Sequence, residues 1–160
     1  MDIVIRDVQN NERQQMLALI LNSYKEYKEE SSPEFWEQYT RNITDAVRSG
    51  PDIERIAAFN GVEMVGSVLL CHKTFKGSDP EIRLLAVSPN ARQQGIAQKL
   101  MTECERRVRQ LGKKRVVLHT THLMQIAKAM YERSNYVRFE EIDFRPVPDF
   151  LVMGFAKELN

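Results

Sequence analysis

The sequence predicts a single mixed α/β domain of 160 residues, with a mostly antiparallel central sheet of about seven strands and about four flanking helices. Three observations support this fold class. Helix-like and strand-like stretches alternate along the chain. The dipeptide Asn60-Gly61 joins two apolar runs, which is typical of a two-residue hairpin. A strand, a helix and another strand follow one another over residues 81–120, the order of a parallel crossover unit.

The first third of the chain predicts one strand and two helices. Residues 2–8 are rich in β-branched residues and favour a strand. Residues 12–29 carry apolar residues at helical spacing. Ser32 and Pro33 then form the N-cap and first position of a second helix, which ends at Gly50.

The rest of the chain alternates strands with two more helices. Strands are expected at residues 55–59, 62–72, 81–87, 116–120, 136–142 and 150–156, with a polar loop at 73–80. One helix follows the strand 81–87 and ends with Gly112 as its C′ residue, and another covers residues 124–134. The apolar run 150–155 is a candidate edge strand for pairing two copies of the chain.

Composition is typical of a soluble globular protein. Charged residues make up 28% and hydrophobic residues 42%, and no apolar run approaches the ~20 residues that span a bilayer. The net charge of +1 gives no overall field toward nucleic acid or an anionic membrane. The N-terminus does not resemble a signal peptide, and Cys71 and Cys104 are too few for a disulfide framework. We therefore expect a cytoplasmic protein with buried thiols.

The most informative segment is a polar turn between a strand and a helix. It reads Leu84-Leu85-Ala86-Val87-Ser88-Pro89-Asn90-Ala91-Arg92-Gln93-Gln94-Gly95-Ile96-Ala97. The first turn of a helix has backbone N–H groups without intrahelical partners and a partial positive charge, so it can bind a phosphate. Arg92 adds a cation, and Gly95 lets the backbone approach a diphosphate closely. Taken alone, one glycine is equally compatible with an ordinary tight turn.

Residues 92–97 resemble the pyrophosphate-binding signature Arg/Gln-x-x-Gly-x-Gly/Ala of the GNAT superfamily, the acetyl-CoA-dependent N-acetyltransferases. In that family the signature also follows a strand that ends in Val-x-Pro. Residues 127–136 are similar to the second cofactor segment, in which a helix ends in Tyr-Glu-Lys/Arg-x-Gly-Phe. The resemblance covers nearly the whole chain and is strongest over residues 81–136. It implies the GNAT fold, whose parallel strands splay apart and hold the pantetheine of the coenzyme.

Two positions depart from the family pattern. Met124 stands where the family often has an Asn seven residues before the tyrosine, which removes one polar contact near the cofactor. Asn135 stands where glycine is usual. This second change is mild, because Asn tolerates a left-handed backbone better than other non-glycine residues.

The resemblance implies acetyl-CoA as cosubstrate, no metal, and a set of residues around the coenzyme. The cofactor-binding positions are Leu85, Ala86, Val87, Arg92, Gln93, Gln94, Gly95, Ile96, Ala97, Met124, Ala127 and Tyr131. It also implies that a backbone N–H of residues 85–87 stabilises the oxyanion of the tetrahedral intermediate.

Acetyl transfer to an amine requires a neutral amine and a proton for the departing thiolate. A Lys-like amine with a pKa of ~10.4 is about 3.4 units from neutrality at pH 7. Glu81 matches the base of histone-type relatives with Glu-Ile-x-x-x-Ala-Ile/Val, and a solvated carboxylate is the alternative. Tyr131 matches the family tyrosine whose hydroxyl points at the CoA sulfur and can protonate the thiolate. A core aromatic beside Ala127 and Met124 is the alternative.

The acceptor site is less well defined. By resemblance the first two helices and the late strands form it, and an aromatic and acidic surface there suits a cationic amine. Its candidate residues are Tyr24, Tyr27, Glu29, Glu30, Phe35, Trp36 and Tyr39. The same aromatic spacing is also typical of a helix core.

The three histidines, His72, His119 and His122, do not predict a metal site, since no third ligand of suitable spacing accompanies His119 and His122. His119 is expected to be packed or hydrogen-bonded, with a proton relay as the alternative if it lies near the cleft. The chain has no Gly-x-Ser-x-Gly motif and no Walker loop, which disfavours acyl-enzyme hydrolases and nucleotidases.

These observations favour an N-acetyltransferase of EC 2.3.1 type that moves an acetyl group from acetyl-CoA to a primary amine of a small molecule or peptide, by direct transfer in a ternary complex. A protein N-terminal or lysine acetyltransferase and a non-catalytic acyl-CoA-binding module are the alternatives. Glu81 and Tyr131 favour an enzyme over a module. Because dimers are frequent among relatives, the protein is also a candidate homodimer.

Overall fold

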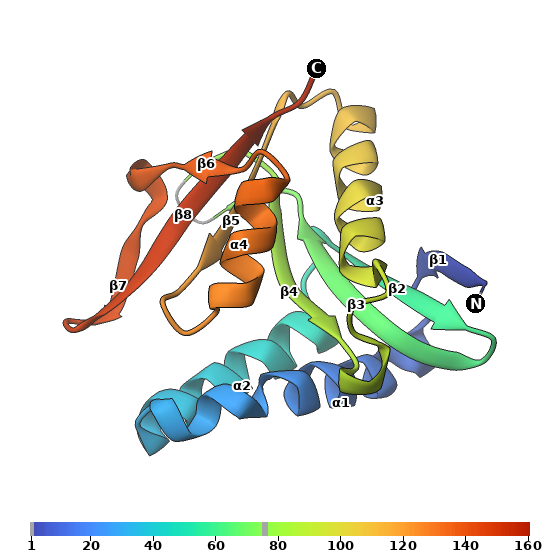
Figure 1. Ribbon diagram of the computed structural model, residues 1–160, viewed down its shortest axis with the longest axis horizontal. Helices are drawn as coiled ribbons and strands as arrows, with labels where there is room; N and C mark the ends of the chain where they lie inside the picture. The colour runs from blue at the N-terminus through green and yellow to red at the C-terminus, as the bar shows by residue number, and fades with distance from the viewer. Residues whose placement is uncertain (1, 75–76) are drawn as a thin grey trace.

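In the computed structural model, which describes residues 2–74 and 77–160, the described strands form an eight-stranded sheet in the order β1-β2-β3-β4-β5-β8-β6, with β7 paired to β8 (Figure 1). The strands are β1 (Ile3–Asp7), β2 (Ile53–Asn60), β3 (Glu63–Cys71), β4 (Glu81–Val87), β5 (Arg115–Thr120), β6 (Val137–Arg138), β7 (Phe144–Val147) and β8 (Phe150–Glu158). Among these described strands only β4 and β5 pair in parallel. The predicted mixed, mostly antiparallel fold is confirmed.

Two pairs of helices cover the two faces of this sheet. They are α1 (Arg13–Tyr24) and α2 (Pro33–Arg48) on one face, and α3 (Ile96–Gln110) and α4 (Gln125–Arg133) on the other. Met16, Ile20 and Ile43 pack against one face together with Phe59 and Leu69. The opposite core is made by a second set of buried residues, among them Ile56, Val68, Leu100, Cys104 and Val116. No helix in the described ranges is both long and apolar enough to cross a membrane.

The helix ends follow the local signals in the sequence. The Ser32 hydroxyl accepts a hydrogen bond from the Phe35 N–H at 3.1 Å and so caps α2. Gly112 follows α3 with a φ of 76°, and Asn135 follows α4 with a φ of 72°. Asn135 therefore adopts the left-handed backbone that was expected of it, and it ends the helix as glycine would.

The first helix and the hairpin differ from prediction by a few residues. The helix predicted over residues 12–29 is α-helical only to Tyr24, and Lys25–Glu30 continues as a 3₁₀ helix. In the hairpin Asn60 pairs with Glu63, so the turn residues are Gly61 and Val62 rather than Asn60-Gly61. Gly61 has a φ of 62° and Val62 has none in the positive range, the pattern of a type II′ turn.

The strand predicted over residues 136–142 is wrong beyond its start. Only Val137–Arg138 pairs with β8, since Glu140–Ile142 forms a 3₁₀ turn, and the unpredicted strand β7 follows. The turn places Ile142 against Gly154 of β8, where any side chain would collide with Ile142. Glycine at this position allows the close approach that interrupts the strand.

The C-terminal strand is not an edge strand, contrary to the prediction. β8 pairs with β5 on one side and with β6 and β7 on the other. Within the run 150–155, residues 153–155 pair with β5, whereas Phe150 and Val152 pair with β7 alone. The predicted polar loop at 73–80 connects β3 to β4, and its residues 75 and 76 lie outside the described residues.

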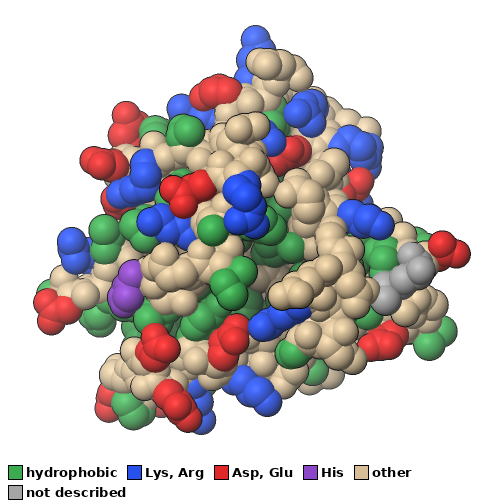
Figure 2. All heavy atoms as spheres, in the orientation of Figure 1, with side chains coloured by type: hydrophobic (Ala, Val, Ile, Leu, Met, Phe, Trp, Pro, Cys, Tyr) green, Lys and Arg blue, Asp and Glu red, His purple; other side chains and the backbone are tan. Residues whose placement is uncertain are grey.

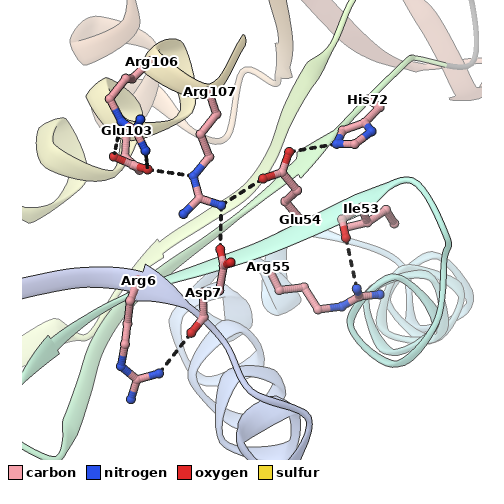
Figure 3. A network of polar contacts seen from close by, with 9 residues as sticks. All are labelled: Arg6, Asp7, Ile53, Glu54, Arg55, His72, Glu103, Arg106 and Arg107. Carbon is pink, nitrogen blue, oxygen red and sulfur yellow. Dashed lines mark hydrogen bonds and ion pairs between the residues drawn. The ribbon is translucent and has the colours of Figure 1, made fainter. Parts of the chain in front are cut away.

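A network of ion pairs ties α3 to β1 and β2 (Figure 3). The Arg107 guanidinium donates to Asp7 at 2.6 Å, to Glu103 at 2.7 Å and to Glu54 at 2.9 Å. The other carboxylate oxygen of Glu54 lies 2.8 Å from His72 Nε2. Both cysteines are free and buried, as predicted.

Candidate active site

The site begins where β4 and β5 separate. Glu81 pairs with Val117 and Ile82 with Leu118, and no further pair joins these two strands in the described ranges. Just beyond, two residues of β4, Leu84 and Leu85, lie opposite one residue of β3, which is a β-bulge. Leu84 has a φ of 54°, in the left-handed region. Because a bulge bends its strand, β4 turns away from β5, and α4 lies in front of the opening (Figure 1).

Helix α1 holds the bulged part of β4. The Tyr24 hydroxyl donates to the Leu85 carbonyl at 2.9 Å, and the Ser23 hydroxyl donates to the Val87 carbonyl at 3.4 Å. Tyr24 is only 9% exposed. Helix α1 therefore holds the backbone of residues 85–87, the segment expected to donate an N–H to the oxyanion.

A cavity of about 830 Å³ lies beside the split. It is lined by α1, α2, β4, β5, α4 and the β7–β8 hairpin, and Figure 2 shows apolar side chains gathered between α4 and α2. Of the predicted site residues, Glu81, Leu85, Met124 and Tyr131 line it. Ala86, Val87, Ala127 and residues 92–97 do not.

The expected acceptor surface is brought together in part. The aromatic members Tyr24, Tyr27, Phe35, Trp36 and Tyr39 line the cavity, and the acidic members Glu29 and Glu30 do not. The hairpin adds the rings of Phe144 and Phe150, in the region of the late strands to which the resemblance assigned part of the acceptor site without naming residues. The cavity wall is therefore more aromatic than expected, and Glu34 and Asp52 line it in place of Glu29 and Glu30.

Glu81 and His119 form a close pair in this cavity. Glu81 Oε2 lies 2.5 Å from His119 Nδ1, and His119 Nε2 lies 2.9 Å from the Ile142 carbonyl. Their side chains are only 8% and 10% exposed. The register of the parallel pair causes this contact, since Glu81 pairs with Val117 and His119 follows two residues later on the same face.

The hydrogen bonds define how many protons the pair holds. A carbonyl can only accept, so Nε2 of His119 carries a proton. A carboxylate and an unprotonated Nδ1 would both be acceptors, so one further proton lies between Glu81 and Nδ1. Glu81 Oε1 has no hydrogen-bond partner among the described residues. The pair can therefore exchange a proton with a group in the cavity through this oxygen.

Tyr131 lies on α4 and is 7% exposed. Burial, its largest influence, raises the pKa of the hydroxyl well above its usual value, and nearby Tyr27 and Tyr39 raise it further. The hydroxyl forms no hydrogen bond to any described residue. It is a protonated donor at neutral pH, and it faces the same cavity as Glu81.

The anion-binding turn lies outside the cavity and is exposed. Gln93 and Gly95 have φ values of 64° and 76°, and Gly95 is the N-cap of α3. In this described segment the N–H groups of residues 93–98 donate to no backbone carbonyl. A Cβ at Gly95 would meet no atom within 4 Å, so the space above it is open. The Arg92 guanidinium nitrogen Nη2 lies 3.4 Å from Glu26 Oε1. The turn can therefore accept an anionic group from solvent.

Sequence reasoning missed three features of the cavity. Arg83 lies two residues after Glu81 on the same strand face, a spacing that could have indicated it. Thr120 ends β5 with a buried hydroxyl that has no partner among the described residues. The pairing of His119 with Glu81 depends on strand register. The three histidines do not meet, since His72 contacts Glu54 and His122 lies against Phe150.

A mixed sheet with a split parallel pair, a cavity at the split and an anion-binding turn is the architecture of CoA-dependent N-acetyltransferases. The sequence profile of the Acetyltransferase (GNAT) family matches residues 14–136, and the chain belongs to this family. Comparison with curated proteins finds no match.

Solved structures show the same fold over nearly the whole chain. The PaiA N-acetyltransferase of Thermoplasma acidophilum, in complex with coenzyme A, is 18% identical with a TM-score of 0.75, covering 96% of this chain and 98% of that one. A GNAT acetyltransferase of Staphylococcus aureus Mu50 is 16% identical with a TM-score of 0.75, covering 99% and 100%. The ribosomal-protein-S18-alanine N-acetyltransferase of Escherichia coli is 12% identical with a TM-score of 0.71, covering 99% and 95%.

Proposed function

We propose that the protein transfers the acetyl group of acetyl-CoA to a primary amine of a small molecule or peptide, by direct transfer within a ternary complex. Family membership supports an acyl-CoA N-acetyltransferase. The observation that carries the proposal further is that a proton-holding pair, Glu81 and His119, and a protonated donor, Tyr131, line one cavity beside the split strands. A protein that only bound acyl-CoA would need neither.

The coenzyme would enter along the opening between β4 and β5. The free N–H groups at the start of α3 and the Arg92 guanidinium would bind its diphosphate, and Gly95 would let the backbone approach it. Pantetheine would then run beside Leu85, Ala86 and Val87 toward Met124, Ala127 and Tyr131. The thioester would arrive in the cavity that contains Glu81.

The reaction needs three proton transfers at this end of the cavity. The incoming ammonium loses a proton to Glu81 Oε1, directly or through a water, and becomes a nucleophile. The amine nitrogen bonds to the thioester carbon, a backbone N–H of residues 85–87 stabilises the oxyanion, and the C–S bond breaks. The thiolate takes the Tyr131 proton, and the second proton of the nitrogen passes to the Tyr131 phenolate, directly or through a water. Glu81 releases its proton to solvent, so the products are the amide, the free thiol and one proton.

Burial makes the Tyr131 hydroxyl a weaker acid than a tyrosine exposed to water. The thiolate that it protonates, however, forms in the same apolar surroundings. A buried thiolate is destabilised as a buried phenolate is, so the pKa values of both groups rise together. Tyr131 can therefore hold its proton until charge develops on sulfur.

We further propose that the protein acts as one domain in the cytoplasm, because its two cysteines are free and buried.

Thiol release from acetyl-CoA with a panel of amines tests this function. We expect thermal stabilisation by CoA and acceptor-dependent release of thiol. Stabilisation by CoA with no turnover on small amines, peptide N-termini or lysine peptides would identify a binding module instead. A lack of any binding would contradict the proposal altogether.

A further inference from the structure

Arg83 is a cation inside the cavity without an anionic partner. It is half-buried on β4, two residues from Glu81, and both side chains line the cavity wall. Among the described residues no carboxylate lies within 4.0 Å of its guanidinium. Some other arginines have a carboxylate partner, as Arg107 has Asp7 and Arg138 has Asp143. The buried Arg55 has none in the described ranges and donates instead to backbone carbonyls.

The side chains around Arg83 add to the cost of leaving its charge without a carboxylate partner. Tyr24 and Tyr39 are buried, which raises the pKa of each hydroxyl, and the Arg83 charge partly opposes that rise. The same is true of the buried Cys71 thiol. Arg83 therefore lies beside two phenols and a thiol, and the carboxylates of Glu34, Asp52 and Glu81 line the same cavity without forming an ion pair with it. A charge held in apolar surroundings is costly unless a counter-ion or water satisfies it, so the site favours an anion.

The coenzyme does not supply that anion in the proposed complex. The turn at Gly95, which binds the diphosphate in the proposal above, is outside the cavity that contains Arg83. The anion must then belong to the acceptor. A guanidinium matches the geometry of a carboxylate, which it can bind with two parallel hydrogen bonds.

Glu81 and Arg83 together present opposite charges on one face of a strand. Alternate residues of a strand are about 7 Å apart, and the arginine side chain can span most of that distance. An amine at Glu81 can therefore belong to the same small molecule as a carboxylate at Arg83. The rings of Phe35, Trp36 and Phe150 leave an apolar space for the remainder of that molecule.

We infer that the acceptor is an α-amino acid with a large apolar side chain, and that Arg83 binds its carboxylate. This inference rests on the proposed acetyl transfer. It narrows the acceptor from any primary amine to a zwitterion.

The test compares L-leucine, L-methionine and L-phenylalanine with their amides as acceptors, in the wild type and in Arg83→Gln. The acids and amides differ in amine basicity, so the informative quantity is the change in the acid-to-amide ratio of kcat/KM between the two enzymes. We expect Arg83→Gln to lower this ratio about ten-fold or more through KM for the acid. Arg83→Lys should recover part of the acid-to-amide ratio, because lysine keeps the positive charge but lacks the paired N–H groups of the guanidinium.

Lys73→Gln is the matched control, since Lys73 is an exposed cation that lines the same cavity. It should leave the ratio unchanged, as should KM for acetyl-CoA in all variants. An unchanged ratio in Arg83→Gln, or an equal loss in Lys73→Gln, would overturn the inference. So would a wild type that acetylates only amines lacking a carboxylate.

A binding measurement separates this inference from the proposed function. Calorimetric titration of the CoA-bound protein with N-acetyl-L-phenylalanine and with its amide needs no turnover. We expect the acid alone to bind about ten-fold or more weakly to Arg83→Gln. Binding that depends on Arg83, without any catalysis, would contradict the proposed acetyl transfer and support the carboxylate site. Equal binding of the acid and the amide would contradict the carboxylate site.

Discussion

Tyr131 is the residue to which the sequence assigns the proton for the departing thiolate. The motif predicts a hydroxyl at the coenzyme sulfur, and the structure places a buried, protonated tyrosine in the cavity with no protein partner for its hydroxyl among the described residues. The alternative of a core aromatic is partly true, because the ring packs 6.1 Å from that of Tyr136. The ring has a structural role, and only the hydroxyl is available for chemistry.

Replacement of Tyr131 by Phe should therefore lower kcat about ten-fold or more and leave KM for acetyl-CoA nearly unchanged. The ring is kept, so the melting temperature should change little. Tyr27→Phe is a suitable control because Tyr27 also lines the cavity. Steady-state kinetics with both substrates varied would refute the acid role if the two variants had the same kcat.

Two His–Glu contacts occur in the described part of the chain, and they allow a matched test of the base. Glu81→Gln should reduce kcat/KM about a hundred-fold near neutral pH, because the amide cannot take the amine proton. Glu54→Gln breaks the other contact, that of Glu54 with His72 outside the cavity. It should leave kcat/KM nearly unchanged. Equal values of kcat/KM for Glu81→Gln and the wild type would mean that the carboxylate is only structural.

At the scale of elements, two glycines at opposite ends of α3 allow the effect of a side chain on coenzyme binding to be distinguished from its effect on backbone strain. Gly95 and Gly112 both have a φ of 76°, and a Cβ would meet no atom within 4 Å at either position. Alanine at either position should cost about 1 kcal/mol of the free energy of unfolding. Only Gly95→Ala should also weaken acetyl-CoA binding, about ten-fold, because its Cβ enters the space of the diphosphate. Calorimetry and urea unfolding measure the two effects, and equal coenzyme affinities in both variants would contradict the phosphate role.

The elements that the sequence predicted well are those with local signals. Ser32, Gly112 and Asn135 each act through the backbone of their own helix, so their effects can be read from a few neighbouring residues. The bulge at Leu84 has no such signal, because leucine does not favour a left-handed backbone. The turn before β7 depends on Ile142 meeting Gly154, twelve residues later. Contacts of this kind exist only after the sheet has formed.

At the scale of the whole molecule, buried tyrosines should make stability depend on alkaline pH. Burial raises the pKa of Tyr39 to about 12, and raises those of Tyr24, Tyr131 and Tyr136 as well. These raised values mean that the folded state holds phenolic protons that the unfolded state releases near pH 10. The contribution to stability is complete below about pH 10 and is lost as pH rises through the folded values.

Urea unfolding between pH 8 and pH 12 should accordingly show the free energy of unfolding falling above about pH 10. Tyr39→Phe should reduce that slope, because one of the titrating groups is gone. Tyr27→Phe serves as the comparison, since the Tyr27 hydroxyl is less buried and its pKa is raised less. Identical slopes for the wild type and Tyr39→Phe would contradict this account.

The candidate site shows why a sequence defines a coenzyme site more readily than an acceptor site. The proposed coenzyme residues 92–97 are contiguous, and their spacing is itself the signal. The proposed acceptor cavity is built from side chains as distant as Tyr24 and Phe150, and the partnership of Glu81 with His119 follows from the register of two strands. The role proposed for Arg83 depends on there being no carboxylate within 4.0 Å of its guanidinium among the described residues, which no linear pattern reports.

The place of β8 between β5 and the β6–β7 segment has a consequence for synthesis. A ribosome delivers the phosphate turn and both split strands well before Phe150, the residue at which β8 starts and one wall of the cavity forms. Beyond its two pairs with β4, β5 has β8 as its partner in the described ranges, so the split strands stay incompletely paired until β8 is made. The cavity wall that we propose receives the amine therefore forms only in the last stage of folding.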